Sequence, residues 1–198
     1  MYIKKITGYL CNDEFIERNL KGRLDTFTPQ TIRSKNYKNW RAILDLRICA
    51  ECRLRHGQIY KIDEDVNPAP PLHHNCRCDI SVMESIIAGN ATNEAKEGAD
   101  YRLKHFSELP EYYITKNDLI ALGWKEGKKP SKYAPGKMYS KGIYDNLDLH
   151  LPDAPGRIWY EADINYYEGR RNKHRVLWSN DGLIFVTYDH YETFYEII

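Results

Sequence analysis

The sequence contains few cysteines and no long apolar run. Five cysteines among 198 residues are too few, and odd in number, for a disulfide framework, which favours a reduced compartment or a metal site. No run of about 18 apolar residues occurs, so we expect no membrane span. The N-terminus, MYIKKITGYLCNDEF, lacks the apolar core of a secretory signal peptide, and we therefore expect synthesis in the cytoplasm.

The sequence also lacks an excess of charge of one sign. The formal net charge is +1, and residues 101–198 hold 14 basic and 14 acidic residues. Bulk charge therefore cannot attract nucleic acid, and any affinity must come from a local patch. The segment YEADINYYEGRRNKHR (160–175) crowds three carboxylates and four lysine or arginine side chains together.

Composition divides the chain into two parts. Residues 1–100 hold all five cysteines, whereas residues 101–198 hold twelve of the sixteen tyrosines and three of the four tryptophans. The small, polar stretch AGNATNEAKEGAD (88–100) lies between them and is typical of a linker or a helix start. We therefore predict two domains, residues 1–90 and 91–198.

Helical patterns are limited to a few segments. Apolar spacing predicts helices over residues 13–25, 39–55 and 94–106. The sequence TKND, beginning at Thr115, is typical of a capping box, and we expect the helix that follows to stop at Gly123.

The C-terminal part changes to a strand-like pattern. Asp181 and Gly182 stand between two apolar runs and predict a two-residue hairpin turn. The glycines, prolines and lysines of residues 127–142 indicate a loop. Strands are expected within residues 157–167, 174–180, 183–190 and 192–198.

The turns predict which side chains share a face of this sheet. A turn at Asp181–Gly182 places Arg175 opposite Tyr188, and a turn centred on Glu168 places Glu161 opposite Arg175. Paired residues, and residues two apart on one strand, share a face. One face would carry Glu161, Asp163, Arg171, Lys173, Arg175, Tyr188 and His190, and the other Ala162, Ile164, Val176, Trp178 and Phe185.

Two interpretations fit the charged face. It can be the solvated side of an antiparallel sheet. Its mixture of groups also suits RNA cleavage, because the 2′-hydroxyl of RNA is a built-in nucleophile. That reaction needs a base, an acid and cations around the phosphate, which a carboxylate, an imidazole and guanidiniums supply without a metal.

Several long motifs in the second half resemble a known family. They are LPEYYITKNDLIALGW (109–124), APGK (134–137), LPDAPGRIWYEADINYYEGRRNKHR (151–175) and DHYETF (189–194). Over residues 95–198 the sequence is similar to the barnase-like bacterial members of the microbial guanyl-specific ribonucleases. This resemblance implies an α+β fold with N-terminal helices packed on a twisted antiparallel sheet. It also implies cleavage of single-stranded RNA by transesterification through a 2′,3′-cyclic phosphate.

The resemblance assigns roles by position. Glu161 matches the general base and His190 the general acid. Lys116, Arg171 and Arg175 match phosphate-binding cations, Asp163 the carboxylate that holds the arginines, Tyr191 an aromatic at the site edge, and Arg157 and Asp181 a structural ion pair.

The base-recognition loop departs from the family pattern. The resemblance places base recognition at Tyr144, Asn146 and Asp148, with Asp148 replacing a glutamate and Leu147 replacing an arginine. A carboxylate can still accept hydrogen bonds from guanine, but the cation is lost. Guanine preference is therefore left open, and so is the way in which a barstar-like protein inhibitor would bind.

A lysine-rich loop lies between these motifs. We expect it to be mainly solvated, with a role in holding the RNA backbone as the alternative. Its lysines are Lys125, Lys128, Lys129, Lys132 and Lys137.

The cysteines of the first half form two close groups, CAEC (49–52) and HHNCRC (73–78). Four thiolates suit a tetrahedral structural zinc site, which would organise a segment too small for its own core. The predicted ligands are Cys49, Cys52, Cys76 and Cys78, and His73 or His74 can replace one of them because Cys76 and Cys78 are unusually close. The alternative is four incidental free cysteines.

The motifs CAECRLRHGQIY and PPLHHNCRC, within residues 40–82, resemble the C-terminal end of phage Mu-type head-morphogenesis (minor head) proteins. This resemblance implies a fusion that carries a nuclease toxin or effector, with phage capsid or portal proteins as partners. It also implies association with phage particles, or export without a signal peptide.

The sequence leaves three possible functions for this protein. The first is an endoribonuclease, with no cofactor for catalysis. The second is a structural head-assembly protein whose nuclease-like domain binds nucleic acid or protein but is inactive. The third is a zinc-dependent nucleic-acid module.

Overall fold

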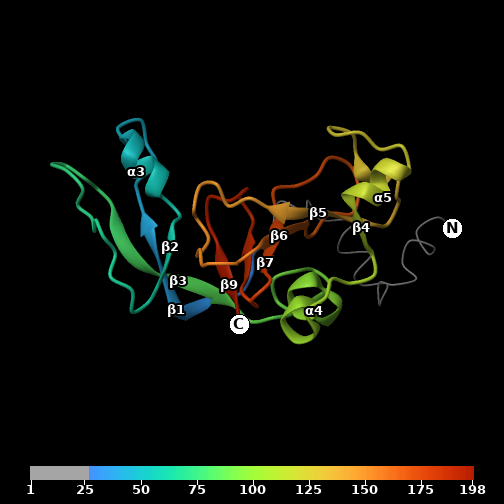
Figure 1. The fold of residues 1–198 in the computed structure, drawn as a ribbon, viewed down its shortest axis with the longest axis horizontal. Helices are drawn as coiled ribbons and strands as arrows, with labels where there is room; N and C mark the ends of the chain where they lie inside the picture. The colour runs from blue at the N-terminus through green and yellow to red at the C-terminus, as the bar shows by residue number, and fades with distance from the viewer. Residues whose placement is uncertain (1–26) are drawn as a thin grey trace.

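The computed structural model describes residues 27–198, and within them one nine-stranded sheet forms the centre of the molecule (Figure 1). The strand order is β2-β1-β3-β9-β8-β7-β6-β5-β4. The strands are β1 (Ile32–Arg41), β2 (Ile59–Lys61), β3 (Asp79–Ile86), β4 (Tyr113–Thr115), β5 (Met138–Tyr144), β6 (Trp159–Asp163), β7 (Arg175–Ser179), β8 (Ile184–Thr187) and β9 (Tyr195–Ile197). The helices are α3 (Ala50–Arg55), α4 (Ala99–Phe106) and α5 (Lys116–Ala121), with 3-10 turns η2 (Ala95–Glu97) and η3 (Pro130–Lys132).

The fold is a mixed α/β structure with few helices, and its sheet is mixed rather than antiparallel throughout. The pairs β3–β9 and β4–β5 are parallel. Parallel neighbours need a crossover connection, and the chain makes a long excursion between the two strands of each pair. Across the described residues, 27–198, no helix has the length and apolar character to cross a bilayer.

Some helix expectations are confirmed and others are wrong. The Thr115 side chain accepts a hydrogen bond from the backbone N–H of Asp118, so the capping box is confirmed. The helix expected over residues 39–55 is wrong for its first part, because β1 continues to Arg41 and α3 begins at Ala50. The helix expected over residues 13–25 lies outside the described residues.

The segment 127–142, expected to be a loop, contains most of β5. Glycine and lysine obscured a strand that carries Tyr139 near its start and Ile143 and Tyr144 at its end. Parallel pairing with β4 and antiparallel pairing with β6 hold it in the sheet. Tertiary pairing therefore overrides the local composition.

The β7–β8 register differs by one residue from the expected one. Arg175 lies opposite Thr187, not Tyr188, because the hairpin loop has three residues, Asn180 to Gly182, and closes with the hydrogen bond from Ser179 N to Leu183 O. A one-residue shift exchanges the faces of a strand. Tyr188 therefore packs with the Val176 face, and Phe185 lies on the Glu161 face, the reverse of both expectations.

The β6–β7 register differs by two residues, which preserves the faces. Asp163 lies opposite Arg175, and Glu161 lies opposite Leu177. Three residues assigned to the charged face, Arg171, Lys173 and His190, lie in loops rather than in strands.

The two faces of the sheet have separate cores. Ala99 and Leu103 of α4 pack with Ala162, Val176 and Val186 on one face. On the other face, Tyr37, Ile59 and Met83 from the N-terminal half cover Trp159, Leu151, Leu177, Phe185 and Phe194. The sheet and this second core both combine residues from before and after positions 90 and 91. The domain boundary between these positions stays a prediction.

Candidate functional site

A buried pair of carboxylates forms the centre of the site. Glu161 and Asp163 alternate on β6 and therefore share one face, with exposed fractions of 1% and 0%. Arg175 lies opposite Asp163 on β7 and is also buried. A buried carboxylate stays ionised when a cation pairs with it, and cations surround these two carboxylates.

Two arginines bind the carboxylates. Arg171 places Nε and Nη2 on the two oxygens of Asp163, at 2.6 and 2.5 Å. Arg175 Nε lies 3.1 Å from Asp163 Oδ1 and 3.5 Å from Glu161 Oε1. The bidentate geometry fixes Arg171, and its guanidinium also lies 4.5 Å from the ring centre of Tyr139. The structure thus brings together four of the residues that the sequence assigned to the site.

His190 belongs to the loop after β8 and is exposed. Its backbone N–H donates to the carbonyl of Lys173 at 3.2 Å, which holds this loop against the β6–β7 loop. Asp189 organises the turn by accepting hydrogen bonds from Thr187 Oγ1 and the backbone of Thr193. Partial desolvation, and then the positive charge of Arg175, lower the pKa of His190. The negative charge of Glu161 acts in the opposite direction.

Two tyrosines close the other side of Glu161. The rings of Tyr144 and Tyr191 are stacked, with centroids 5.4 Å apart. Burial, and then the charge of Glu161, raise the pKa of Tyr144 to about 12. The same two causes raise the pKa of Tyr191. Both phenols therefore remain neutral hydrogen-bond donors beside the carboxylate.

The loop predicted to recognise the base is held by the side chain of Asn146. The buried side chain of Asn146 donates to the carbonyl of Leu151 at 3.0 Å and accepts from its N–H at 3.1 Å. This amide therefore shapes the loop. Asp148 is exposed, and Leu147 is 86% exposed, so neither side chain is part of the core.

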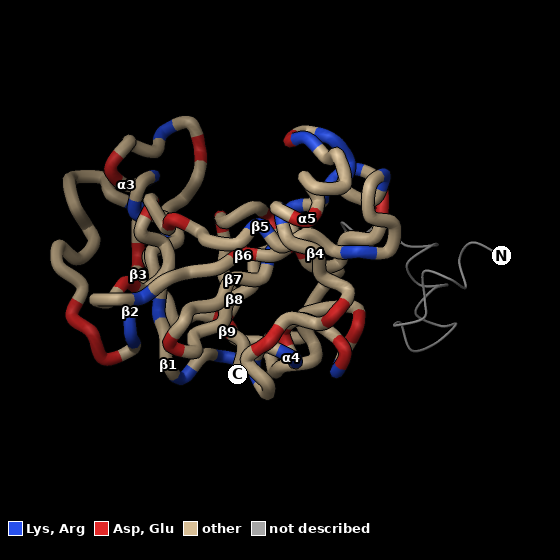
Figure 2. The backbone as a smooth tube through the Cα atoms, turned by 45° about the vertical axis from the view of Figure 1, so that its right-hand side comes forward, with Lys and Arg blue, Asp and Glu red and all other residues tan. Residues whose placement is uncertain are grey.

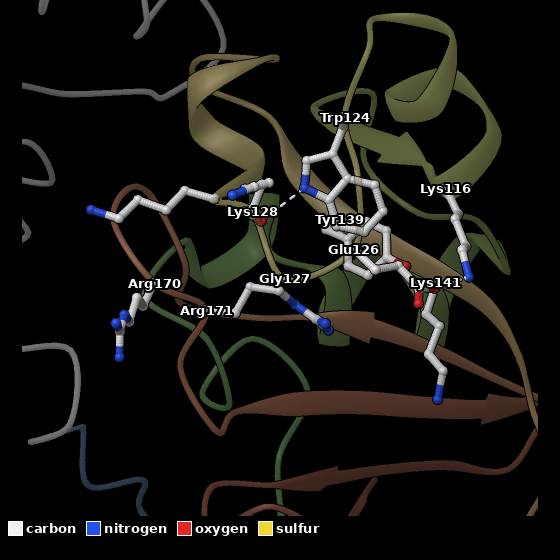
Figure 3. A pocket seen from close by; sticks show the side chains of 10 residues that line it. Lys116, Trp124, Glu126, Gly127, Lys128, Tyr139, Lys141, Arg170 and Arg171 are labelled. Atoms are coloured by element: carbon white, nitrogen blue, oxygen red, sulfur yellow. Dashed lines mark hydrogen bonds and ion pairs between the residues drawn. The ribbon is translucent and has the colours of Figure 1, made fainter.

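An open cleft of about 540 Å³ is lined by Lys141 and Arg171, two of the cations that pair with Glu161. Figure 3 shows Arg170 on one side and Lys116 with Lys141 on the other, with Arg171 between them. Lys116, at the start of α5, pairs with Glu126 across the rim. The remaining lining residues are Trp124, Gly127, Lys128, Lys129 and Tyr139.

This cleft gathers positive charge in a chain that is almost neutral. Figure 2 shows lysine and arginine collected beside α5, where the loop leads to β5. Lys128 and Lys129, expected to be mainly solvated, line the cleft, whereas Lys125, Lys132 and Lys137 do not. Such a local patch attracts phosphates without bulk charge.

Sequence reasoning missed Lys141. Its Nζ lies 3.1 Å from Glu161 Oε2 and lines the cleft. The residue lay in a segment expected to be a loop, so no face could be assigned to it. The residues Tyr139, Ile143 and Tyr144 in MYSKGIY, of types that favour strands, were the signal that could have indicated the strand.

Comparison with known proteins identifies relatives of the C-terminal half. A family model described as "ribonuclease" matches residues 95–198, more than half of the chain. The chain belongs to the ribonuclease family. A ribonuclease of Heyndrickxia coagulans is 46% identical over 100 residues, which cover 50% of this chain and 91% of that relative. Ribonucleases of Bacillus intermedius and Bacillus pumilus are also 46% identical over 100 residues, and the match spans 61% of each.

The segment before the ribonuclease-family region has its own relatives. A family model described as "Phage Mu protein F like protein" matches residues 10–81. This confirms the resemblance expected for residues 40–82 and extends it toward the N-terminus.

Outside the ribonuclease-family region, cysteine and histidine side chains converge into groups that could hold a metal ion. One group is Cys49, Cys52 and His73, and another is Cys52, Cys76 and Cys78. His73 Nε2 lies 3.3 Å from the Sγ atoms of both Cys49 and Cys52, and the Sγ atoms of Cys52 and Cys76 are 3.8 Å apart. The structure thus brings His73, rather than His74, to the predicted cysteines.

Proposed function

We propose that this protein is an endoribonuclease that cleaves single-stranded RNA by metal-independent transesterification. The observation that carries the proposal is the buried Glu161 carboxylate beside a cationic cleft, with Lys141, Arg175 and Arg171 at 3.1, 3.5 and 4.0 Å. Membership of the ribonuclease family supports the same reaction class.

Glu161 is the general base of the proposed reaction. It accepts the proton of the 2′-hydroxyl while the 2′-oxygen forms a bond to phosphorus. Each carboxylate oxygen has two acceptor sites, so ion pairing with Lys141 and Arg175 leaves sites for the hydroxyl. The stacked tyrosines and the β-sheet exclude water from its other side.

His190 is the general acid. The bond from phosphorus to the 5′-oxygen breaks as the imidazolium gives its proton to that oxygen, and a 2′,3′-cyclic phosphate remains on the other fragment. The electrostatic influence of both Glu161 and Arg175 on His190 supports its nearness to the reacting phosphate.

The arginines stabilise the negative charge of the transition state. Asp163 fixes Arg171 and Arg175 before substrate arrives, so little reorganisation is needed when charge develops on the phosphate. Lys116 would bind the same phosphate or its neighbour from the opposite rim. Tyr144 and Asp148 would contact the base, while Asn146 keeps the loop in shape.

The N-terminal half gives the proposed nuclease its biological setting. Its match to Phage Mu protein F like proteins supports a minor head protein that carries a toxin or effector module. Capsid or portal proteins would be its partners, the phage particle its carrier, and a barstar-like inhibitor would protect the producing cell. Growth arrest on expression of the wild type, but not of Glu161→Gln, is the expected sign of toxicity.

We also propose a structural zinc in the N-terminal half. With Zn–S bonds of about 2.3 Å and Zn–N bonds of about 2.0 Å, tetrahedral ligand atoms lie roughly 3.5–3.8 Å apart. The separations of 3.3 and 3.8 Å around Cys52 suit this geometry. Cys49, Cys52 and His73 would supply three ligands, and Cys76 or Cys78 the fourth.

Cleavage of a fluorogenic RNA oligonucleotide by the full chain in EDTA tests the enzyme. We expect cleavage, a 2′,3′-cyclic phosphate product by mass spectrometry, and losses of at least about 10²-fold in Glu161→Gln and in His190→Ala. Circular dichroism would verify that each variant is folded. Undiminished activity in both variants would contradict the mechanism. A folded but inactive wild type would support the head-assembly function instead.

A further inference from the structure

Lys141 reaches the site because β5 contains an irregularity opposite Glu161. Ser140 pairs with Ala162, but the next pair is Gly142 with Glu161, so Lys141 is an extra residue between two partners. A bulge of this kind re-aims a side chain and increases the local twist. Gly142 has φ of +95°, a conformation that glycine adopts without strain.

The bulge brings a cation to a carboxylate that is otherwise sealed. Glu161 is 1% exposed, whereas the Lys141 side chain is 46% exposed and lines the cleft. The ammonium has three donors. One donor can engage Glu161 Oε2 at 3.1 Å, while the others are directed toward the open cleft.

Lys141 differs from the arginines in its partner. Both arginines approach Asp163 more closely than Glu161, at 2.5 against 4.0 Å for Arg171 and 3.1 against 3.5 Å for Arg175. Lys141 is the nearest of the three cations to Glu161. The chain thus divides its positive charge, with the arginines on Asp163 and the lysine on Glu161.

Position 147, in the loop that follows β5, carries no charge. The family resemblance places an arginine at this position, but here Leu147 is 86% exposed and brings no charge. We propose that Lys141, on the strand β5 that leads into this loop, supplies the cation that position 147 lacks. It holds Glu161 in place and binds a non-bridging oxygen of the scissile phosphate. This inference rests on the proposed ribonuclease function.

The test compares four variants of the full chain in RNA cleavage. Lys141→Met keeps the length and removes the charge, and we expect kcat/KM to fall about 10²-fold. Lys141→Arg should retain most activity. Adding Leu147→Arg to Lys141→Met should restore at least tenfold. Lys125→Met makes the same change of net charge outside the cleft and should act as wild type.

A pH profile separates an electrostatic role from a merely structural one. The groups that face Glu161 are Lys141 and Tyr144 of β5, Asp163 of β6, Arg175 of β7, Arg171, and His190 and Tyr191. Loss of the nearest cation makes a carboxylate harder to ionise, so the acid side of the kcat/KM profile should move to higher pH in Lys141→Met. Lys141→Arg should leave it in place.

The outcomes distinguish this inference from the proposed function. Cleavage that is lost in Glu161→Gln but unchanged in Lys141→Met would overturn the role of Lys141 and leave the ribonuclease intact. An inactive wild type would overturn the ribonuclease. In that case, equilibrium binding of a non-cleavable deoxyoligonucleotide tests whether Lys141 contacts a phosphate. The logarithm of the binding constant falls linearly with the logarithm of the salt concentration, and Lys141→Met should reduce the magnitude of that slope by about one relative to Lys125→Met. Equal slopes would overturn the phosphate contact.

Discussion

The backbone N–H of Ile59 donates a hydrogen bond of 2.9 Å to the carbonyl oxygen of His150. This contact joins the phage-related half to the loop that carries Asn146 and Asp148. Close by, a Cβ added at Gly57 would lie 3.1 Å from the carbonyl oxygen of Glu192, in the loop that carries His190. Both loops of the candidate site therefore rest on the N-terminal half.

Ile59→Ala should weaken both stability and activity. Ile59 is 6% exposed and packs in the core with Leu151 and Trp159, so its truncation should lower the free energy of unfolding by about 2–5 kcal/mol. Urea unfolding measures this loss, and kcat/KM should fall because the loops lose their support. Leu54→Ala, at a side chain 69% exposed, is the matched control and should stay within about 0.5 kcal/mol. Equal stabilities of Ile59→Ala and Leu54→Ala would mean that the two halves are not coupled through this core.

The pH dependence of cleavage should report on His190. Burial and Arg175 lower its pKa below the ordinary 6.5. Because the acid must be protonated, kcat/KM should fall as pH rises through this lowered value, and the alkaline side of the profile should begin below about pH 6.5.

Lys173→Met tests that assignment. The positive charge of Lys173 also lowers the pKa of His190, so its removal should move the alkaline side of the profile to higher pH. Lys125→Met, with the same loss of charge, should not move it. A profile that stays unchanged in Lys173→Met would argue against His190 as the titrating acid.

Asp163→Asn should cost far more stability than Asp181→Asn. Asp163 is fully buried between Arg171 and Arg175, and its loss removes the nearer of their two carboxylate partners and leaves only Glu161, at about 3–5 kcal/mol. Asp181, half-exposed, pairs with Arg157 on the surface and confirms the expected ion pair. Chemical denaturation at pH 7 compares the two variants, and similar losses would contradict the ranking.

Acid should remove the contribution of Asp181. The Arg157 guanidinium lowers the pKa of Asp181 to about 2 in the folded protein. The stabilisation is therefore present above the unfolded-state value of about 3.9 and is lost as pH falls toward 2. The stability of Asp181→Asn should consequently vary less with pH over this interval than that of the wild type.

Metal analysis should find one zinc ion per chain. Cys52→Ser should abolish binding, since Cys52 belongs to both groups of candidate ligands. His73→Ala should weaken it, while His74→Ala and Cys11→Ser serve as controls that retain it. Inductively coupled plasma mass spectrometry of the purified chain gives the stoichiometry. Full zinc content in His73→Ala would contradict His73 as a ligand and favour the four cysteines as the ligand set.

The sequence predicted the identities of the candidate site residues but not all of their positions. Alternation on β6 was enough to place Glu161 and Asp163 on one face, because a side-chain period of two holds along any strand. The capping box likewise predicted the start of α5, since it depends on residues three apart.

Only the tertiary structure decided what depends on pairing between distant segments. The three-residue hairpin loop moved Tyr188 and Phe185 to the faces opposite those expected, because one residue of register inverts a strand. The bulge in β5 brings Lys141 to Glu161, and β2 of the N-terminal half contacts a loop of the candidate site. Such contacts join residues far apart in the chain, so their geometry is fixed by the packing of the whole sheet and cannot be found in any local pattern.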